Sequence, residues 1–514
     1  MGRKLQFKIP FDQDVERYLQ QNHPKVADYR LISKSLDARG AGRGKKPICH
    51  YSLDVVGSGE SFRSFQEDFK GKDFKGKPPI IVGAGPAGLF CALRLAEYGI
   101  PTIILERGAP ANQRMKHISR HWRYGVFDKE NNVCFGEGGA GLFSDGKLIT
   151  RVKSPHIKYV MNKFVDFGAP KEVAYVSNPH LGSNKIRGLI SKITDHLKES
   201  GHDIRYEKKV AKLLYAKDSV VGVELEDGEK IFSDHVILAA GHSAHEMYYH
   251  LEENNVSMKQ KDFAVGVRIE HFRREMDQMQ FGHFAGHEKL GTARYRLSYH
   301  DHLNDRGTYS FCMCPGGYIL SSGTNQNGIV VNGMSNFARN SPWSNAALVV
   351  TVKAGRDFAT NNLMSGLEFQ KNIEKRAFSL SQKSATGREI PAQTIEQFLS
   401  GKKANVKEQK HSCPSGVFSQ NMDELLPKFI TDELKTALGD FEKKIKGFSS
   451  TKGVLLAPET RTSAPVNIQR DKKTFISTSH SGLYPCGEGA GHAGGITSAA
   501  VDGIKVAESI VSQI

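Results

Sequence analysis

Cysteine, tryptophan and long apolar runs are scarce in this chain of 514 residues, which contains 7 Cys and 2 Trp. The cysteines are odd in number and far apart, except for Cys312 and Cys314, so a secreted disulfide framework is not expected. The N-terminus lacks the apolar stretch of a signal peptide. The longest segment without Asp, Glu, Lys or Arg, residues 307–338, is too rich in Gly, Ser and Asn to span a bilayer. These absences predict a soluble, cytoplasmic protein.

Acidic residues are too few to balance the basic ones. The chain has 71 Lys+Arg against 55 Asp+Glu, a formal net charge of +16. Such a charge favours anionic ligands, nucleic acid or an acidic surface, without choosing among them. Glycine is abundant instead, at 51 residues or about 10%, against a usual value of about 7%. The glycines are clustered, which predicts loops where the backbone approaches a ligand closely.

Residues 1–64 are predicted to form a small separate unit. Its elements follow the order strand, helix, strand, strand, at 5–9, 14–21, 29–36 and 48–55. Residues 1–77 carry 16 Lys+Arg and 10 Asp+Glu, so 16 − 10 gives this part a charge of +6. A solvated surface is favoured over nucleic-acid binding, because the unit lacks the aromatic motif of an RNA-stacking sheet. A polar linker is predicted at 65–77.

A dinucleotide-binding fingerprint follows the linker. A short apolar run at 79–82 ends in Gly83-Ala84-Gly85-Pro86-Ala87-Gly88, and residues 89–98 have the apolar spacing of a helix. A second apolar strand at 102–105 ends in Glu106, 23 residues beyond Gly83 (106 − 83). Strand, glycine turn, helix and acidic strand end are the context that such a fingerprint requires.

Each residue type in the fingerprint has a physical role. Gly83 permits the tight turn, Gly85 lets a diphosphate approach bare backbone, and Gly88 lets the helix pack on the sheet. The helix N-terminus supplies free N–H groups for the phosphates. Glu106 can accept hydrogen bonds from ribose hydroxyls and disfavours a 2′-phosphate. We also predict cofactor contacts for Pro86, Ala87 and Arg107.

Two further matches to the glycine pattern, at 136–141 and 489–494, have no acidic strand end about 20 residues on. A second nucleotide domain is therefore not expected. The fingerprint binds ADP and does not distinguish NAD from FAD. Residues 210–241 resemble the β-meander and closing turn of flavoproteins with two dinucleotide domains. Residues 482–488, followed by a helix at 496–510, resemble the C-terminal return of such flavoproteins to the flavin.

Longer motifs extend the resemblance. They are Phe135-Gly136-Glu137-Gly138-Gly139-Ala140-Gly141-Leu142-Phe143-Ser144-Asp145-Gly146-Lys147-Leu148, Cys312-Met313-Cys314-Pro315-Gly316-Gly317-Tyr318, Val331-Asn332-Gly333-Met334-Ser335, Glu459-Thr460-Arg461-Thr462-Ser463-Ala464-Pro465-Val466 and residues 487–503. Together they resemble the bacterial family of uncharacterised FAD-dependent dehydrogenases, NAD(P)/FAD-dependent oxidoreductase-like flavoproteins, over about residues 78–514. His492 stands where many relatives have Tyr.

The resemblance implies a set of flavin contacts. Glu488 would bond a ribityl hydroxyl, and the helix N-terminus at Gly495 and Ile496 would face flavin O2 and stabilise the negative charge that develops on reduction. The other residues predicted to contact the cofactor are Gly139, Ser144, Asp145, Val210, Ala240, Gly241 and Gly487.

Three side chains are candidate catalytic residues. Lys147 could bond flavin N5 or O4, or form only a salt bridge with an acid such as Asp145. Arg461 could clamp a substrate carboxylate, or it could form hydrogen bonds with polar groups of the protein core. His492, and also His242, could donate a proton or be held simply by hydrogen bonds.

Cys312 and Cys314 form a C-x-C pair and not the C-x-x-C of a thioredoxin-like site. In a strand their Cα atoms would lie nearly 7 Å apart, at about 3.3 Å per residue, which is at the limit for a disulfide. Two reduced thiols are predicted. No cysteine spacing supports an iron–sulfur cluster or zinc, and no G-x-S-x-G turn suggests a hydrolase.

The predicted fold is a doubly wound, Rossmann-like α/β FAD-binding domain at 78–256 and 454–514. An α+β substrate domain at 257–453 is inserted in it, and the small β-α-β-β domain precedes it. The predicted function is an FAD-dependent oxidoreductase that passes hydride through flavin N5, with a small-molecule substrate or electron acceptor and with NAD(P)H only as a transient donor. The alternatives are an RNA-directed flavoprotein or RNA-binding module, with nucleic acid as a less favoured partner, and a flavin-bearing interaction protein without turnover.

Overall fold

The computed structural model describes residues 3–62, 69–449 and 453–514. The N-terminal unit is an antiparallel sheet in the order β1-β3-β2 with one helix. Its elements are β1 (Arg3–Pro10), α1 (Val15–Asn22), β2 (Asp28–Asp37), the short 3₁₀ turn η1 (Ala41–Arg43) and β3 (Ile48–Val56). The Asp14 side chain caps α1 by accepting from Arg17 N at 3.0 Å. The predicted β-α-β-β order is confirmed, whereas residues 65–68 of the predicted linker lie outside the described residues.

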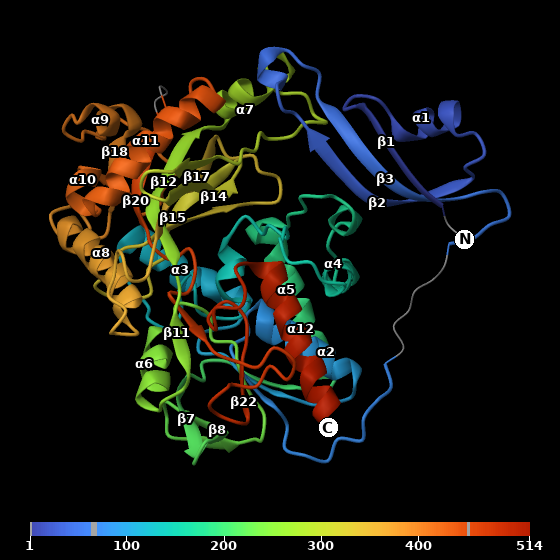
Figure 1. Ribbon diagram of the computed structural model, residues 1–514, viewed down its shortest axis with the longest axis vertical. Helices are drawn as coiled ribbons and strands as arrows, with labels where there is room; N and C mark the ends of the chain where they lie inside the picture. The colour runs from blue at the N-terminus through green and yellow to red at the C-terminus, as the bar shows by residue number, and fades with distance from the viewer. Residues whose placement is uncertain (1–2, 63–68, 450–452) are drawn as a thin grey trace.

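This unit packs against the rest of the molecule. Its core residues Ile9 and Phe11 form a cluster with Phe281 and Leu290 from the middle of the chain. The backbone of Lys34 in β2 also exchanges hydrogen bonds of 3.0 and 2.9 Å with residues 175–177. Figure 1 shows the unit as a separate blue sheet beside the main body. These contacts hold β2 and its unit against the main body of the molecule.

A parallel five-stranded sheet follows, in the order β22-β10-β4-β5-β6. Its strands are β4 (Ile80–Val82), β5 (Ile103–Leu105), β6 (Asp203–Arg205), β10 (Val236–Leu238) and β22 (Leu483–Pro485). The three inner strands are nearly all apolar and buried, as expected when helices cover both faces. The predicted parallel α/β sheet and the C-terminal return to it are confirmed, because β22 pairs with β10 beside β4.

Six helices and two 3₁₀ turns accompany this sheet: α2 (Pro86–Glu97), α3 (Ala111–Tyr124), η2 (Gly139–Phe143), α4 (His156–Asp166), η3 (Lys171–Ala174), α5 (Gly182–Glu199), α6 (His245–Glu253) and α12 (Ile496–Gln513). Figure 1 shows α2 and α12 side by side. A Cβ at Gly503 would lie 2.0 Å from the Ala87 carbonyl oxygen, so glycine is required where these helices cross. The N-terminal and C-terminal segments that accompany the parallel sheet are thereby joined at close range.

The predicted β-meander is present as the antiparallel sheet β7-β8-β9. A further short pair joins this part to the C-terminal segment. The strands concerned are β7 (Val210–Ala216), β8 (Ser219–Leu225), β9 (Lys230–Phe232), β11 (Met258–Gln260) and β21 (Val466–Ile468).

The middle of the chain forms a seven-stranded sheet, in the order β13-β14-β17-β12-β20-β18-β19, antiparallel except for the β18–β19 pair. The strands are β12 (Phe263–Phe272), β13 (Ser298–Asp301), β14 (Arg306–Cys314), β17 (Trp343–Val352), β18 (Ile390–Thr394), β19 (Val417–Ser419) and β20 (Val454–Glu459), with the hairpin β15 (Gly317–Ser321) and β16 (Val331–Ser335) beside them. The accompanying helices are α7 (Arg273–Phe281), η4 (Gly282–Phe284), α8 (Ser365–Ser381), α9 (Ile395–Ser400), α10 (Met422–Leu425) and α11 (Lys428–Lys444). Figure 1 shows α8 to α11 gathered along one side of this sheet.

Strand β20 lies in a different sheet from the one that the predicted domain boundary implies. The return segment was expected to start at residue 454, but Val454–Glu459 pairs with β12 and β18 in the seven-stranded sheet. The apolar residues of this strand fit either sheet, and tertiary pairing decides between them. We propose that the chain is divided into domains as predicted, except that the C-terminal return segment begins after Glu459. In the part of the chain described here, no helix is both long and apolar enough to cross a membrane.

Candidate cofactor and substrate site

One large cavity, of about 1940 Å³, lies where the parallel sheet, the seven-stranded sheet and the N-terminal unit meet. Pockets for one small ligand usually measure roughly 300–1,000 Å³, so this cavity has room for more than one. The predicted site residues that line it are Gly83, Gly85, Pro86, Ala87, Glu106, Arg107, Gly139, Ser144, Asp145, Lys147, Val210, Ala240, Gly241, Arg461, Glu488, His492, Gly495 and Ile496. Gly88 and Gly487 do not line it and act through packing.

The glycine turn after β4 has the predicted geometry. Gly83 has a φ of +105°, and a Cβ there would lie 2.5 Å from the Ala239 carbonyl oxygen. A Cβ at Gly88 would lie 2.0 Å from the Gly83 carbonyl oxygen, so Gly88 closes the helix onto the strand. A Cβ at Gly85 would meet no atom within 4 Å. The bare backbone of Gly85 therefore fits a diphosphate lying in the cavity.

Two helix N-termini border the cavity. Helix α2 begins after Gly85 and α12 after Gly495, and neither has a side-chain cap. Their first N–H groups lack helical partners and carry partial positive charge. The glycine-rich 136–141 segment lies between them, since a Cβ at Gly139 would be 3.3 Å from Gly85 Cα and one at Gly141 would be 3.1 Å from the Ile496 side chain. Both termini are suited to hold negative groups of one extended ligand.

Glu106 holds three backbone turns together at this end of the cavity. Its Oε2 accepts from Ala84 N at 2.9 Å, and its Oε1 accepts from Gly108 N at 3.0 Å and Gly136 N at 2.9 Å. The carboxylate is buried yet lines the cavity. Beyond the predicted ribose contact, it therefore fixes three backbone turns relative to one another.

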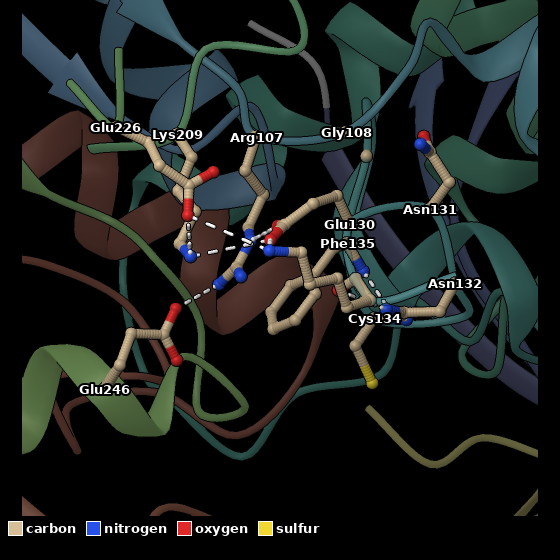
Figure 2. Close-up of polar contacts among 12 residues, drawn as sticks. Arg107, Gly108, Glu130, Asn131, Asn132, Cys134, Phe135, Lys209, Glu226 and Glu246 are labelled. Carbon is tan, nitrogen blue, oxygen red and sulfur yellow. Dashed lines mark hydrogen bonds and ion pairs between the residues drawn. The ribbon is translucent and has the colours of Figure 1, made fainter. Parts of the chain in front are cut away.

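Arg107 forms part of the same wall (Figure 2). Its guanidinium lies over the Phe135 ring at 3.8 Å. Its Nε donates to Glu130 at 2.6 Å, and one terminal nitrogen donates to Glu246 at 2.5 Å. Lys209 lies close by, 2.9 Å from Glu226. Glu130, Glu246 and the Phe135 ring hold the flat guanidinium of Arg107 in one orientation at the edge of the cavity.

Asp145 and Lys147 follow the glycine-rich segment. Asp145 is fully buried and accepts hydrogen bonds from Ser335 and Arg339. Burial opposes its ionisation, but the cations of Lys147 and Arg339 outweigh this and lower the pKa of Asp145. Lys147 Nζ lies 3.5 Å from Asp145 and has no hydrogen-bond partner among the described residues. The ammonium group is thus available to a ligand, while Ser144 bonds locally to the Gly141 carbonyl at 2.8 Å.

Glu488 stands after β22, near the N-terminus of α12. Burial raises the pKa of Glu488 to about 7, although the nearby Lys261 acts in the opposite direction. Lys261 Nζ donates to the Gly491 carbonyl at 3.3 Å and also lines the cavity. A carboxyl group at this position can accept or donate a hydrogen bond near neutral pH.

The structure does not support the predicted role of Arg461 as a clamp for a substrate carboxylate. Its Nε and one terminal nitrogen pair with Glu374 at 2.9 and 2.7 Å, and its other terminal nitrogen donates to Ser243 and Thr324. The bidentate edge of the guanidinium is therefore already occupied. These contacts match the alternative, in which Arg461 forms hydrogen bonds with polar groups of the protein core.

His492 and His242 differ in their partners. His492 Nε2 lies 2.9 Å from the Ile468 carbonyl oxygen and so carries its proton, while Nδ1 lies 3.5 Å from the Asn467 amide nitrogen. Burial lowers the pKa of His492. These contacts are those of a histidine held by hydrogen bonds, which is the alternative to a proton donor. His242 Nε2, in contrast, is buried without a hydrogen-bond partner in the described chain and lines the cavity.

Cys312 is a cavity residue that the sequence did not assign to the site. It has a φ of +44° at a bulge in β14, and both it and Cys314 are free thiols, as predicted. A hydrogen bond from Cys314 and the cations of Lys147 and Arg268 lower the pKa of Cys312. The C-x-C spacing was visible, but its position beside Lys147 depends on tertiary packing. Within the described residues, no three His, Cys, Asp or Glu side chains are grouped to hold a metal ion.

Comparisons with known proteins give two family models and one relative for this chain. The family models "Pyridine nucleotide-disulphide oxidoreductase" and "FAD-dependent protein, C-terminal domain-like" match residues 78–269 and 262–462. An uncharacterized protein of Clostridium beijerinckii is 40% identical over 463 residues, which are 90% of this chain and 85% of the relative.

Similar solved structures include CtdE in complex with FAD, at 13% identity and a TM-score of 0.31 over 85% of this chain and 84% of that chain. A triple mutant of the flavin-dependent brominase Bmp2 has 11% identity and a TM-score of 0.37 over 85% and 80%.

The parallel sheet with its glycine turn and the C-terminal return define an α/β flavoprotein with a Rossmann-like FAD-binding fold. The chain belongs to the bacterial family of uncharacterised FAD-dependent dehydrogenases, and FAD is its cofactor.

Proposed function

We propose that the protein is an FAD-dependent dehydrogenase or reductase that passes a hydride through flavin N5 to or from a small molecule. The observation that carries this proposal is the large cavity, which joins two helix N-termini and extends beyond the space of one ligand. FAD, when bound, supplies the two-electron chemistry, and the protein supplies orientation and electrostatics.

The chain's residues divide the work along the cavity. The turn at Gly85 and the N-terminus of α2 hold the diphosphate, with Glu106 at the adenosine ribose. Glu488 bonds a ribityl hydroxyl, and the N-terminus of α12 stabilises negative charge at the pyrimidine side of the flavin. Lys147, whose ammonium is ion-paired with Asp145 but makes no hydrogen bond among the described residues, stabilises charge at N5 or O4.

NAD(P)H is proposed only as a transient electron donor. The glycine segments at 136–141 and 489–494 lead into η2 and α12 and belong to the same FAD-binding part. In the described structure neither segment is followed, about 20 residues on, by a strand that ends in an acidic residue. This arrangement supports brief contact of a nicotinamide with the flavin rather than a dedicated site that binds NAD(P)H tightly.

An absorbance spectrum of the purified protein tests the proposal, followed anaerobically while NADH, NADPH or a chemical reductant is added. We expect oxidised-flavin bands that bleach on reduction. Glu106→Arg should remove the flavin, because it breaks the three backbone contacts that shape the adenosine end. Glu252→Arg, on the exposed side of α6, is the matched control and should keep it. A colourless wild-type protein that FAD does not reconstitute would contradict the proposal.

The RNA-directed alternative gains no support from the fold or the comparisons. It depended on the basic charge of the N-terminal unit, but Lys34 and its neighbours in β2 line the cavity.

A flavin-bearing protein without turnover differs from the proposal in one measurable respect, since no donor would then bleach its flavin.

A further inference from the structure

The cavity continues beyond the cofactor to an outer end built from three separate segments. Residues 144–152 lead to it from the glycine-rich turn, β2 of the N-terminal unit forms one wall, and residues 294–298 form another. Figure 1 shows β2 far from β7 and β8, which belong to the adenosine side. The outer end is therefore the part of the cavity that the cofactor leaves free.

Unpaired cations gather at this outer end. None of these four residues has a carboxylate partner in the described parts of the chain: Lys34, Arg151, Arg294 and Arg296. Asp37, which also lines this end, is already paired with Arg39 at 2.7 Å. The uncompensated charge is positive, so this part of the cavity attracts anions.

Arg294 and Arg296 project from one side of an extended stretch. Ala293, Tyr295 and Leu297 are buried, while the alternate arginines are exposed to the cavity. Alternation of this kind places both guanidinium groups on the same face. The surrounding walls of the cavity desolvate Arg294 and, together with repulsion from Arg339, lower its pKa to about 10, although the nearby Asp145 acts in the opposite direction. A bound anion would supply the missing counter-charge.

Exposed apolar side chains lie among these cations. Leu36, Ile149 and Val152 are 38%, 48% and 39% exposed, and all three line the cavity. Exposed apolar groups that cluster in a concave site mark a binding surface. A purely polar anion such as phosphate would leave this apolar surface uncovered.

We propose that the outer end is the substrate site, that it takes an anionic molecule with an apolar body, and that β2 of the N-terminal unit is one of its walls. The arginine pair binds the anionic group, and the apolar body covers Leu36, Ile149 and Val152. This inference rests on the proposed function where it takes the bound molecule as the reaction partner of the flavin.

Isothermal titration calorimetry on the FAD-loaded protein tests the proposal with three probes. Sodium octanoate carries an anionic group and an apolar body, octyltrimethylammonium carries the same body with opposite charge, and inorganic phosphate carries charge alone. We expect saturable binding of octanoate that is tighter than that of either other probe. Equal binding of octanoate and octyltrimethylammonium, or of octanoate and phosphate, would overturn the proposed substrate class.

Two variants locate the site. Arg294→Gln/Arg296→Gln should weaken octanoate binding roughly tenfold or more, because charge-assisted hydrogen bonds are lost. The matched control Arg120→Gln/Arg123→Gln removes two exposed arginines of α3 that do not line the cavity, and should leave binding unchanged. Leu36→Ser should weaken binding severalfold. If it has no effect, β2 is not a wall of the site.

Because heat is measured, binding does not depend on flavin turnover. Octanoate binding that is unchanged in Arg294→Gln/Arg296→Gln would overturn this inference. A flavin that no donor reduces in any variant would instead contradict the proposed function.

Discussion

The cofactor end and the outer end of the cavity are built from different parts of the polypeptide. At the proposed cofactor end, glycine backbone and helix N-termini line the cavity. Their spacing is fixed within short segments of strand, turn and helix. At the outer end and along the seven-stranded sheet, side chains from distant segments form the walls. A backbone-built site tolerates no added side chain, whereas a side-chain-built site depends on how its charges are paired.

The largest effect is expected at the cofactor end. Gly85→Val places a side chain in open cavity without striking protein atoms, and the residue has an ordinary φ of −80°. The fold should remain while the diphosphate is excluded. Losing two charge-assisted hydrogen bonds of about 1.5–3 kcal/mol each weakens FAD binding roughly 100-fold or more. Flavin fluorescence during titration of the apoprotein measures this.

Gly188→Val is the matched control for that substitution. Gly188 is an exposed position in α5 where a Cβ also meets nothing within 4 Å, but it does not line the cavity. FAD affinity should be unchanged in this variant. Equal loss of affinity in both variants would show that the Gly85 effect comes from the fold and not from the cavity.

The second effect concerns a buried ion pair in the seven-stranded sheet, between Arg268 of β12 and Glu459 of β20. Arg268 is fully buried, and it pairs with Glu459 at 2.8 Å and donates to the Cys312 carbonyl at 3.2 Å. Arg268→Gln leaves a buried carboxylate unpaired, which should cost about 3–5 kcal/mol of unfolding free energy. Urea denaturation at constant FAD measures the loss.

Arg268→Met/Glu459→Leu tests the origin of that loss. Replacing a buried pair by apolar groups of similar size is often nearly neutral. We expect the double variant to recover at least half of the lost stability. A double variant less stable than Arg268→Gln would mean that the hydrogen bonds of Arg268 to Asn345 and Asn332 carry the effect instead of the charge pair.

The same contrast explains what could be predicted from the sequence. The glycine turn, the meander and the C-terminal return depend on local order and were correctly predicted. For Arg461 the sequence left two roles open, because its partner Glu374 lies 87 residues away and only packing brings the two together. For the same reason nothing in residues 29–36 indicated that β2 lines the cavity. Side-chain pairing across the fold leaves no local pattern.

The smallest effect is a pH dependence in the seven-stranded sheet. Burial raises the pKa of Glu270 to about 7, although its hydrogen bonds from Ser412 oppose this. The folded protein therefore holds a proton that the unfolded chain releases above about pH 4.5. This group's contribution to the unfolding free energy should fall by about 1–3 kcal/mol as pH rises from about 4.5 to about 7, and then stay constant.

Glu270→Gln removes that titration while keeping the side-chain shape. Its Tm relative to wild type should rise between pH 5 and pH 7 and level off above, because only the wild type loses stability there. Glu408→Gln, at an exposed position, should show a constant difference across the same range. Parallel Tm profiles for wild type and Glu270→Gln would mean that Glu270 is ionised throughout. In that case the buried carboxylate would be stabilised by its contacts with Ser412 alone.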